Sequence, residues 1–79
     1  MTTDASGPQP RASIVKRSLT VSGHRTSISL EDAFWRRLRG LADARRLSLS
    51  GLIAEIDATR GEANLSSAIR VYVLEHALQ

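Results

Sequence analysis

The segment Arg25-Thr26-Ser27-Ile28-Ser29-Leu30 decides the fold of this 79-residue chain. Polar and apolar side chains alternate along it, and a period of two is typical of a β-strand that buries one of its faces. The expected buried face carries Thr26, Ile28 and Leu30. The expected outer face carries Arg25, Ser27 and Ser29.

A second strand-like segment precedes this one. Val15, Leu19 and Val21 alternate with polar residues, although Arg17 falls on the apolar side. The sequence Ser22-Gly23-His24 between the two segments is typical of a turn, because glycine tolerates the positive φ that tight turns require. Two arrangements remain open: the segments form one hairpin, or they belong to different sheets.

Three helical segments follow, and we expect them at residues 31–46, 49–60 and 65–78. Apolar side chains recur every three or four residues in each, as on the buried face of a helix. Arg45 and Arg46 are expected in the last turn of the first helix, where the helix dipole favours bases. Gly40 lies inside this helix and leaves room for another helix to cross closely.

The expected second helix has a good N-terminal cap in Ser48. The expected third helix has apolar side chains on two sides, which predicts contacts with more than one neighbour. Residues 1–13 are polar and aperiodic, and we expect a disordered tail there. The sequence therefore predicts a single domain over residues 14–79, mainly α-helical with a short β-ribbon region at residues 14–30.

The composition limits the function. A chain of this size buries a modest core, and without cysteines it has no disulfide to stabilise it, so the sequence favours an oligomer. No run of apolar residues is long enough to cross a membrane, and a soluble, cytoplasmic protein is expected. The net charge of +3 is the sum of +5 in residues 1–46 and −2 in residues 47–79, and a basic first half suits a polyanionic partner.

Catalysis and metal binding have little support. The two histidines, His24 and His76, are far apart in the sequence, and no Cys accompanies them. No glycine-rich phosphate loop or nucleophile elbow is present. We therefore expect no enzyme activity, no metal and no cofactor.

One strand followed by two helices with a short turn resembles the ribbon-helix-helix family of bacterial DNA-binding proteins, and most closely a subgroup of short proteins. The resemblance covers residues 16–70. The segments that carry it are Lys16-Arg17-Ser18-Leu19-Thr20-Val21, Gly23-His24-Arg25-Thr26-Ser27-Ile28-Ser29-Leu30-Glu31, Phe34-Trp35, Ile56-Asp57 and Asn64-Leu65-Ser66-Ser67-Ala68-Ile69-Arg70.

The resemblance implies an intertwined homodimer, in which each chain contributes one strand to an antiparallel β-ribbon, with an additional C-terminal helix in this chain. It also implies double-stranded DNA as the partner, since such a ribbon enters the major groove. Apolar side chains from the strand and the first two helices would then form the dimer core. These are Ile28, Leu30, Phe34, Trp35, Leu38, Leu52, Ile53 and Ile56.

The resemblance also implies the DNA contacts. Arg25, Ser27 and Ser29 would contact base edges, and arginine can bind guanine through two hydrogen bonds. Phosphates would be bound by Lys16 and Arg17, and by the N-terminus of the second helix at Ser48, Leu49 and Ser50. If residues 15–21 form the ribbon between the chains instead, the outward residues are Lys16, Ser18 and Thr20.

Two rival interpretations accompany this one. Ser29 and Asp32 have the spacing of a capping box, in which Ser29 would cap the first helix instead of contacting a base. The whole chain is alternatively a dimeric protein-interaction module, antitoxin-like or an adaptor, that binds another protein through residues 64–79. The acidic second half of the chain and the doubly apolar third helix motivate this alternative.

Overall fold

The computed structural model describes residues 12–77. Strands β1 (Ile14–Val21) and β2 (His24–Glu31) form a two-stranded antiparallel sheet in which every residue of each strand is paired. The two strand-like segments therefore form one hairpin, with both strands in the same chain. Ser22 and Gly23 connect them with φ angles of 53° and 84°. Two positive φ angles are typical of the tight turn whose twist matches that of a hairpin.

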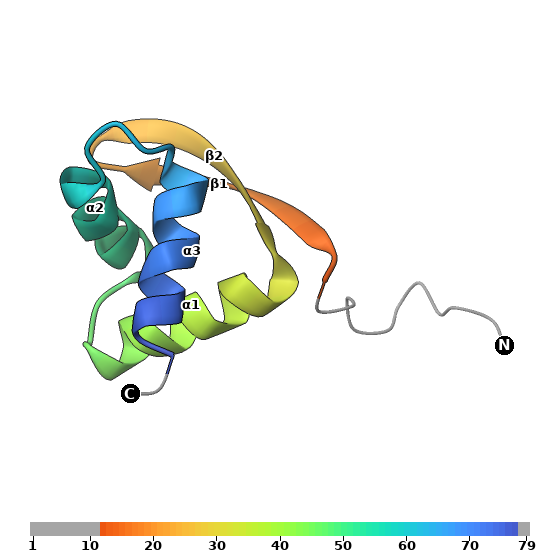
Figure 1. Cartoon of the computed structure of the whole chain (residues 1–79). Helices are drawn as coiled ribbons and strands as arrows, with labels where there is room; N and C mark the ends of the chain where they lie inside the picture. The colour runs from red at the N-terminus through yellow and green to blue at the C-terminus, as the bar shows by residue number, and fades with distance from the viewer. Residues whose placement is uncertain (1–11, 78–79) are drawn as a thin grey trace, which may run out of the picture.

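Three helices follow: α1 (Asp32–Ala44), α2 (Leu49–Thr59) and α3 (Leu65–Glu75). Figure 1 shows the hairpin curving over the helices, with α1 continuing directly from the end of β2. In the same view α2 begins beside the end of α1 and runs towards the hairpin turn. The fold is thus a short β-ribbon followed by helices, as the sequence predicts.

The core lies between the concave side of the hairpin and the three helices. Trp35 is 2% exposed, and its indole Nε1 donates a hydrogen bond of 2.8 Å to the carbonyl oxygen of Val15. This bond joins β1 to α1 and satisfies the polar group that a buried tryptophan brings into a core. The buried apolar residues are Val21, Ile28, Leu30, Trp35, Leu38, Ala42, Leu52, Ile53, Ile56, Ile69 and Val73.

Helix α1 ends at Ala44, two residues earlier than the pattern predicts. Arg46 has a φ of 58°, and it and Leu47 donate backbone hydrogen bonds back to Asp43 and Ala42. These two bonds form a Schellman motif, which ends a helix at a residue in the left-handed conformation. Arg45 and Arg46, expected in the last turn, therefore follow the helix. The sequence did not predict this end, because the left-handed residue is an arginine and not the glycine that usually marks it.

Helices α2 and α3 begin at the expected residues. Ser48 caps α2 and Asn64 caps α3, each with a side-chain oxygen that accepts a backbone N–H. Helix α3 ends at Glu75, and the expected end at residue 78 lies outside the described residues. Most of the expected tail, residues 1–11, also lies outside them. Ser13, however, is bonded to the fold, since its carbonyl accepts the N–H of Asp32 at 2.8 Å.

Candidate nucleic-acid interface

The convex side of the hairpin carries a continuous polar surface. Directly opposite residues in an antiparallel pair point to the same side of the sheet. Lys16 is opposite Ser29, Ser18 is opposite Ser27, and Thr20 is opposite Arg25. We call these six residues the outer face of the hairpin. The hydroxyl oxygens of Ser18 and Ser27 lie 3.3 Å apart across the two strands.

Both sets of residues that the sequence offered for base contact lie on this face. Arg25, Ser27 and Ser29 belong to the strand-like segment 25–30, and Lys16, Ser18 and Thr20 belong to the segment 15–21. The sequence offered these two sets as alternatives. The pairing of β1 with β2 within one chain brings them together in two adjacent rows. The structure therefore places both sets on one surface, and their contact with bases stays a prediction.

The outer face is basic. Lys16 and Arg25 are exposed, and neither forms an ion pair within residues 12–77. The acid at the end of the ribbon is Glu31, whose Oε1 accepts a hydrogen bond of 2.9 Å from Nε of Arg70. This bond from Arg70 lowers the pKa of Glu31 below its ordinary value of 4.5. The remaining free charges on the face are positive, which suits a phosphate-rich partner.

Arg17 lies on the other side of the hairpin, away from Lys16. It is opposite Ile28, and its guanidinium carbon is 5.4 Å from the centre of the Trp35 ring. A cation over the face of an indole is stabilised by the ring electrons. Arg17 thus covers the edge of the core, and the structure separates the two residues that were expected to bind phosphate together. The alternation of β1, which places Arg17 on the apolar side, is the sequence signal for this position.

Ser29 does not cap the first helix. The N-cap of α1 is Glu31, and no side chain caps it by a hydrogen bond. The backbone carbonyl oxygen of Ser29 accepts a hydrogen bond of 3.3 Å from the hydroxyl of Ser66 in α3. The side chain of Ser29, half-buried, stays available on the outer face. No sequence signal pointed to the contact with α3, which joins residues 37 positions apart.

The N-terminus of α2 stands apart from the outer face. Ser48 uses its hydroxyl to accept the N–H of Gly51 at 2.9 Å, and Leu49 and Ser50 follow it, half-buried. Figure 1 places this end of α2 beside the end of α1, and the other end of the helix near the hairpin turn. Within one chain these residues and the ribbon do not form a single surface, so their contact with phosphate stays a prediction.

The residues expected in a dimer core are packed inside the single chain. Seven of them are at most 4% exposed without any partner: Ile28, Leu30, Trp35, Leu38, Leu52, Ile53 and Ile56. Phe34 is half-buried, and the guanidinium carbon of Arg70 lies 5.8 Å from its ring centre. Participation of these side chains in a core shared with a second chain stays a prediction.

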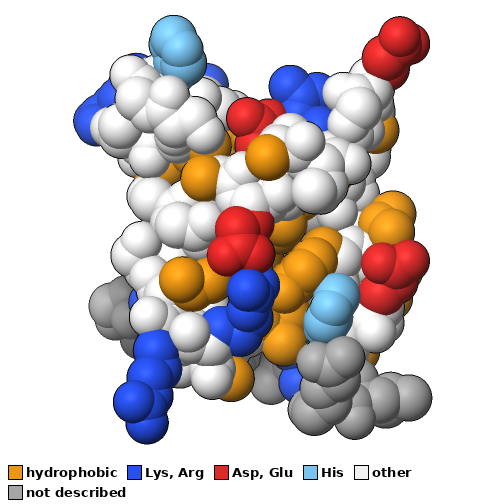
Figure 2. All heavy atoms as spheres, turned by 90° about the vertical axis from the view of Figure 1, so that its left-hand side faces the viewer, with side chains coloured by type: hydrophobic (Ala, Val, Ile, Leu, Met, Phe, Trp, Pro, Cys, Tyr) orange, Lys and Arg blue, Asp and Glu red, His pale blue; other side chains and the backbone are white. Residues whose placement is uncertain are grey.

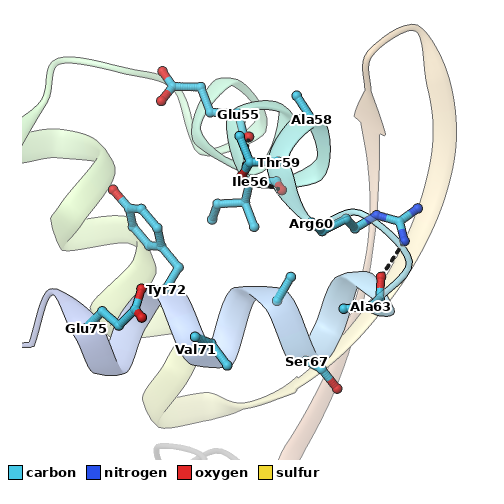
Figure 3. A pocket seen from close by; sticks show the side chains of 11 residues that line it. Glu55, Ile56, Ala58, Thr59, Arg60, Ala63, Ser67, Val71, Tyr72 and Glu75 are labelled. Atoms are coloured by element: carbon cyan, nitrogen blue, oxygen red, sulfur yellow. Dashed lines mark hydrogen bonds between the residues drawn. The ribbon is translucent and has the colours of Figure 1, made fainter.

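A second surface feature lies between α2 and α3. A groove of about 570 Å³ runs between these helices, with Ile56 and Ala58 on one wall and Val71 and Tyr72 on the other. Figure 3 shows the side chains of the two helices facing one another across it. Figure 2 shows hydrophobic side chains gathered in a hollow on this side of the molecule, with acidic and basic side chains around them. The groove is apolar with a charged rim.

The described residues contain no group of potential metal ligands. Within residues 12–77, no three His, Cys, Asp or Glu residues are grouped so that they could hold a metal ion. None of the helices among these residues has the length and apolar character needed to cross a membrane.

Comparison with known proteins identifies the family to which the chain belongs. The model of a family described as "Ribbon-helix-helix domain" matches residues 14–77. A similar solved structure is that of an uncharacterized protein from Bordetella pertussis Tohama I, with a TM-score of 0.77 and 32% sequence identity. The match covers 92% of this chain and 62% of that one, so the chain spans less than two thirds of its structural relative. No curated protein matched the sequence.

A two-stranded antiparallel ribbon followed by helices defines a class of small DNA-binding folds. The chain belongs to the ribbon-helix-helix family. Members of this family are generally DNA-binding regulators that dimerise, and they are typically not enzymes.

Proposed function

We propose that this protein is a sequence-specific transcriptional regulator that acts as a homodimer and inserts its antiparallel β-ribbon into the major groove of double-stranded DNA. We also propose a cytoplasmic localisation, since bacterial DNA lies in the cytoplasm. The observation that carries the proposal is the outer face of the hairpin, where six polar side chains lie in two rows and the free charges are positive.

The dimensions of the ribbon support this mode. Strands of eight residues extend roughly 26 Å, and the major groove, about 12 Å wide, admits a two-stranded ribbon. Arg25 would bind a guanine edge with two hydrogen bonds, while Ser27 and Ser29 add single bonds that discriminate weakly. Lys16, at the far end of the face, would bind a phosphate and set affinity without setting sequence.

A DNA titration tests this proposal. Fluorescence anisotropy would follow the protein with a duplex from its own promoter region and with an unrelated duplex, at two salt concentrations. We expect Arg25→Ala to weaken binding to the promoter duplex by roughly ten- to a hundredfold, as expected for loss of a two-bond contact to a base. Binding to the unrelated duplex should change far less.

Arg39→Ala is the matched control. It removes the same charge from an exposed position on α1 and should reduce affinity for both duplexes slightly and equally. Thermal unfolding of both variants would show that the fold is intact. Equal losses from Arg25→Ala and Arg39→Ala would reject the outer face as the base-contacting surface and leave only a basic protein.

The groove between α2 and α3 supports a second candidate function, a dimeric interaction module that binds another protein through α3. An amphipathic helix is a suitable occupant, because its apolar side chains would fill a groove of this kind. Tyr72→Glu would place a charge in the groove wall. Loss of a protein partner by this variant, with DNA binding absent in the unaltered protein, would favour the module.

A further inference from the structure

A negative charge ends the side of the hairpin that is proposed to face DNA. Glu31 follows Ser29 by two residues on β2, so its side chain points to the same side of the sheet as the outer face. This side chain is 31% exposed. Because DNA carries a dense row of negative phosphates, a carboxylate at this place opposes binding unless another group compensates its charge.

Lys16 is a possible partner of this acid on the hairpin itself. It is opposite Ser29 and is therefore the diagonal neighbour of Glu31 across the two strands, a separation that long side chains can bridge. Lys16 nevertheless forms no ion pair within residues 12–77. No acid in this part of the chain therefore competes with DNA for its ammonium group.

The partner of Glu31 comes from α3 instead. Nε of Arg70 donates a hydrogen bond of 2.9 Å to Oε1 of Glu31. One turn earlier on α3, the hydroxyl of Ser66 donates to the carbonyl oxygen of Ser29 and so holds the helix beside β2. The guanidinium carbon of Arg70 also lies 5.8 Å from the centre of the Phe34 ring, which favours a cation at this place. The third helix thus carries a positive charge to the end of the ribbon.

We propose that Arg70 is a positioning residue for DNA binding, because it neutralises Glu31 and so keeps Lys16 free to bind a phosphate. The inference rests on the proposed function, since it concerns the same surface. Without Arg70, the cation within reach of Glu31 is Lys16, and an ion pair between them removes Lys16 from the DNA. A phosphate contact contributes to affinity and not to sequence preference, so binding to every duplex weakens.

A double-mutant cycle in DNA binding tests this role. Arg70→Gln should weaken binding to the promoter duplex and to an unrelated duplex alike, by about tenfold at low salt, with a salt dependence that corresponds to about one phosphate contact fewer. The double variant with Arg70→Gln and Glu31→Gln should recover both properties. It still lacks the arginine, so its recovery would show that Arg70 acts through Glu31. A double variant as weak as Arg70→Gln would overturn the proposal, because Arg70 then binds phosphate itself or only supports the fold.

Two more substitutions make the test specific. Lys16→Gln should weaken DNA binding in the unaltered protein but have little further effect in the Arg70→Gln variant, in which Lys16 is already paired with Glu31. Losses that simply add would contradict this pairing. Arg39→Gln removes a positive charge from an exposed position of α1 that forms no ion pair within residues 12–77, and it should cost about twofold at most. Equal losses from Arg39→Gln and Arg70→Gln would reject a specific role for Arg70.

A measurement without DNA separates this inference from the proposed function. NMR of the Arg70→Gln variant should show a nuclear Overhauser contact between the ε-methylene of Lys16 and the γ-methylene of Glu31 that the unaltered protein lacks. This contact in a protein that binds neither duplex would reject the proposed function and still support the exchange of partners, whereas DNA binding without it would reject this inference alone. Arg70→Met, which keeps the apolar stem of the side chain against Phe34, replaces Arg70→Gln if that variant does not fold.

Discussion

At the scale of single residues, Arg46 has a backbone conformation that is unfavourable for a residue with a side chain. Its φ of 58° lies in the left-handed region, where a side chain other than glycine crowds the following carbonyl. The conformation is needed because Arg46 and Leu47 donate the two hydrogen bonds that end α1. The chain thus keeps a strained residue at the turn that directs it from α1 into α2.

Arg46→Gly should therefore stabilise the protein. Glycine relieves the strain but also makes the unfolded chain more flexible, so we expect a net gain of about 0.5–1 kcal/mol in the free energy of unfolding. Urea denaturation would measure it. Arg39→Gly, inside α1 and exposed, should instead lose about 1 kcal/mol. A loss of stability from Arg46→Gly would show that the arginine side chain has a stabilising contact that exceeds the strain.

At the scale of elements, α3 supports the strand that carries half of the outer face. The hydroxyl of Ser66 donates to the carbonyl of Ser29, and Arg70 donates to Glu31 two residues further along β2. These two bonds join successive turns of the helix to the end of the strand. We therefore expect substitutions in α3 that remove these bonds to affect the position of this end of β2.

The bond between Arg70 and Glu31 predicts a dependence on pH. Because the pKa of Glu31 is lowered in the folded protein, its contribution is complete above the ordinary value of 4.5 and is lost as the pH falls through the lower folded value. The difference in unfolding free energy between the unaltered protein and Glu31→Gln should be constant near neutral pH and shrink below about pH 4.5. Urea titrations across this range would measure it.

Glu62→Gln is the control, since Glu62 is exposed and forms no ion pair within residues 12–77. It should leave the unfolding free energy unchanged across the range. A difference for Glu31→Gln that does not vary with pH would contradict a role for the charged carboxylate.

The strands and helices follow from local patterns, but their partners do not. The alternation in residues 25–30 identifies which side chains face outwards, because the pleat of a strand dictates it. It does not identify the neighbouring strand, since a strand from the same chain and one from a second chain require the same pattern. The contacts of Arg17 with Trp35 and of Arg70 with Glu31 join distant positions, and no local spacing reports them. The rows of the candidate site were therefore predictable, and their side-by-side arrangement was one of the two that the sequence left open.

At the scale of the whole molecule, α3 is part of the core although it extends a fold of one ribbon and two helices. Ile69 is 0% exposed and Val73 is 5% exposed, and both pack against the other elements. A chain of this size has little stability to spare, so the third helix contributes to folding as well as to surface contacts.

Truncation after Ala63 should therefore unfold the protein. It removes two buried apolar side chains, each contributing about 1.5–3 kcal/mol, together with the bonds to β2. Circular dichroism should show loss of the cooperative thermal transition. Ser67→Ala, at an exposed position of α3, should retain it. A truncated chain that melts at the original temperature would show that α3 is an independent appendage.

The pairing of both ribbon strands within one chain gives the ribbon a direction. A ribbon assembled from two identical strands presents every side chain twice, related by symmetry, and looks the same from either end. Here one row carries Lys16, Ser18 and Thr20 and the other carries Arg25, Ser27 and Ser29, so the two ends differ. On the proposed mode of binding, each such ribbon distinguishes the two directions of the half-site that it enters. A single substitution in the homodimer then alters one contact in each half of the DNA site.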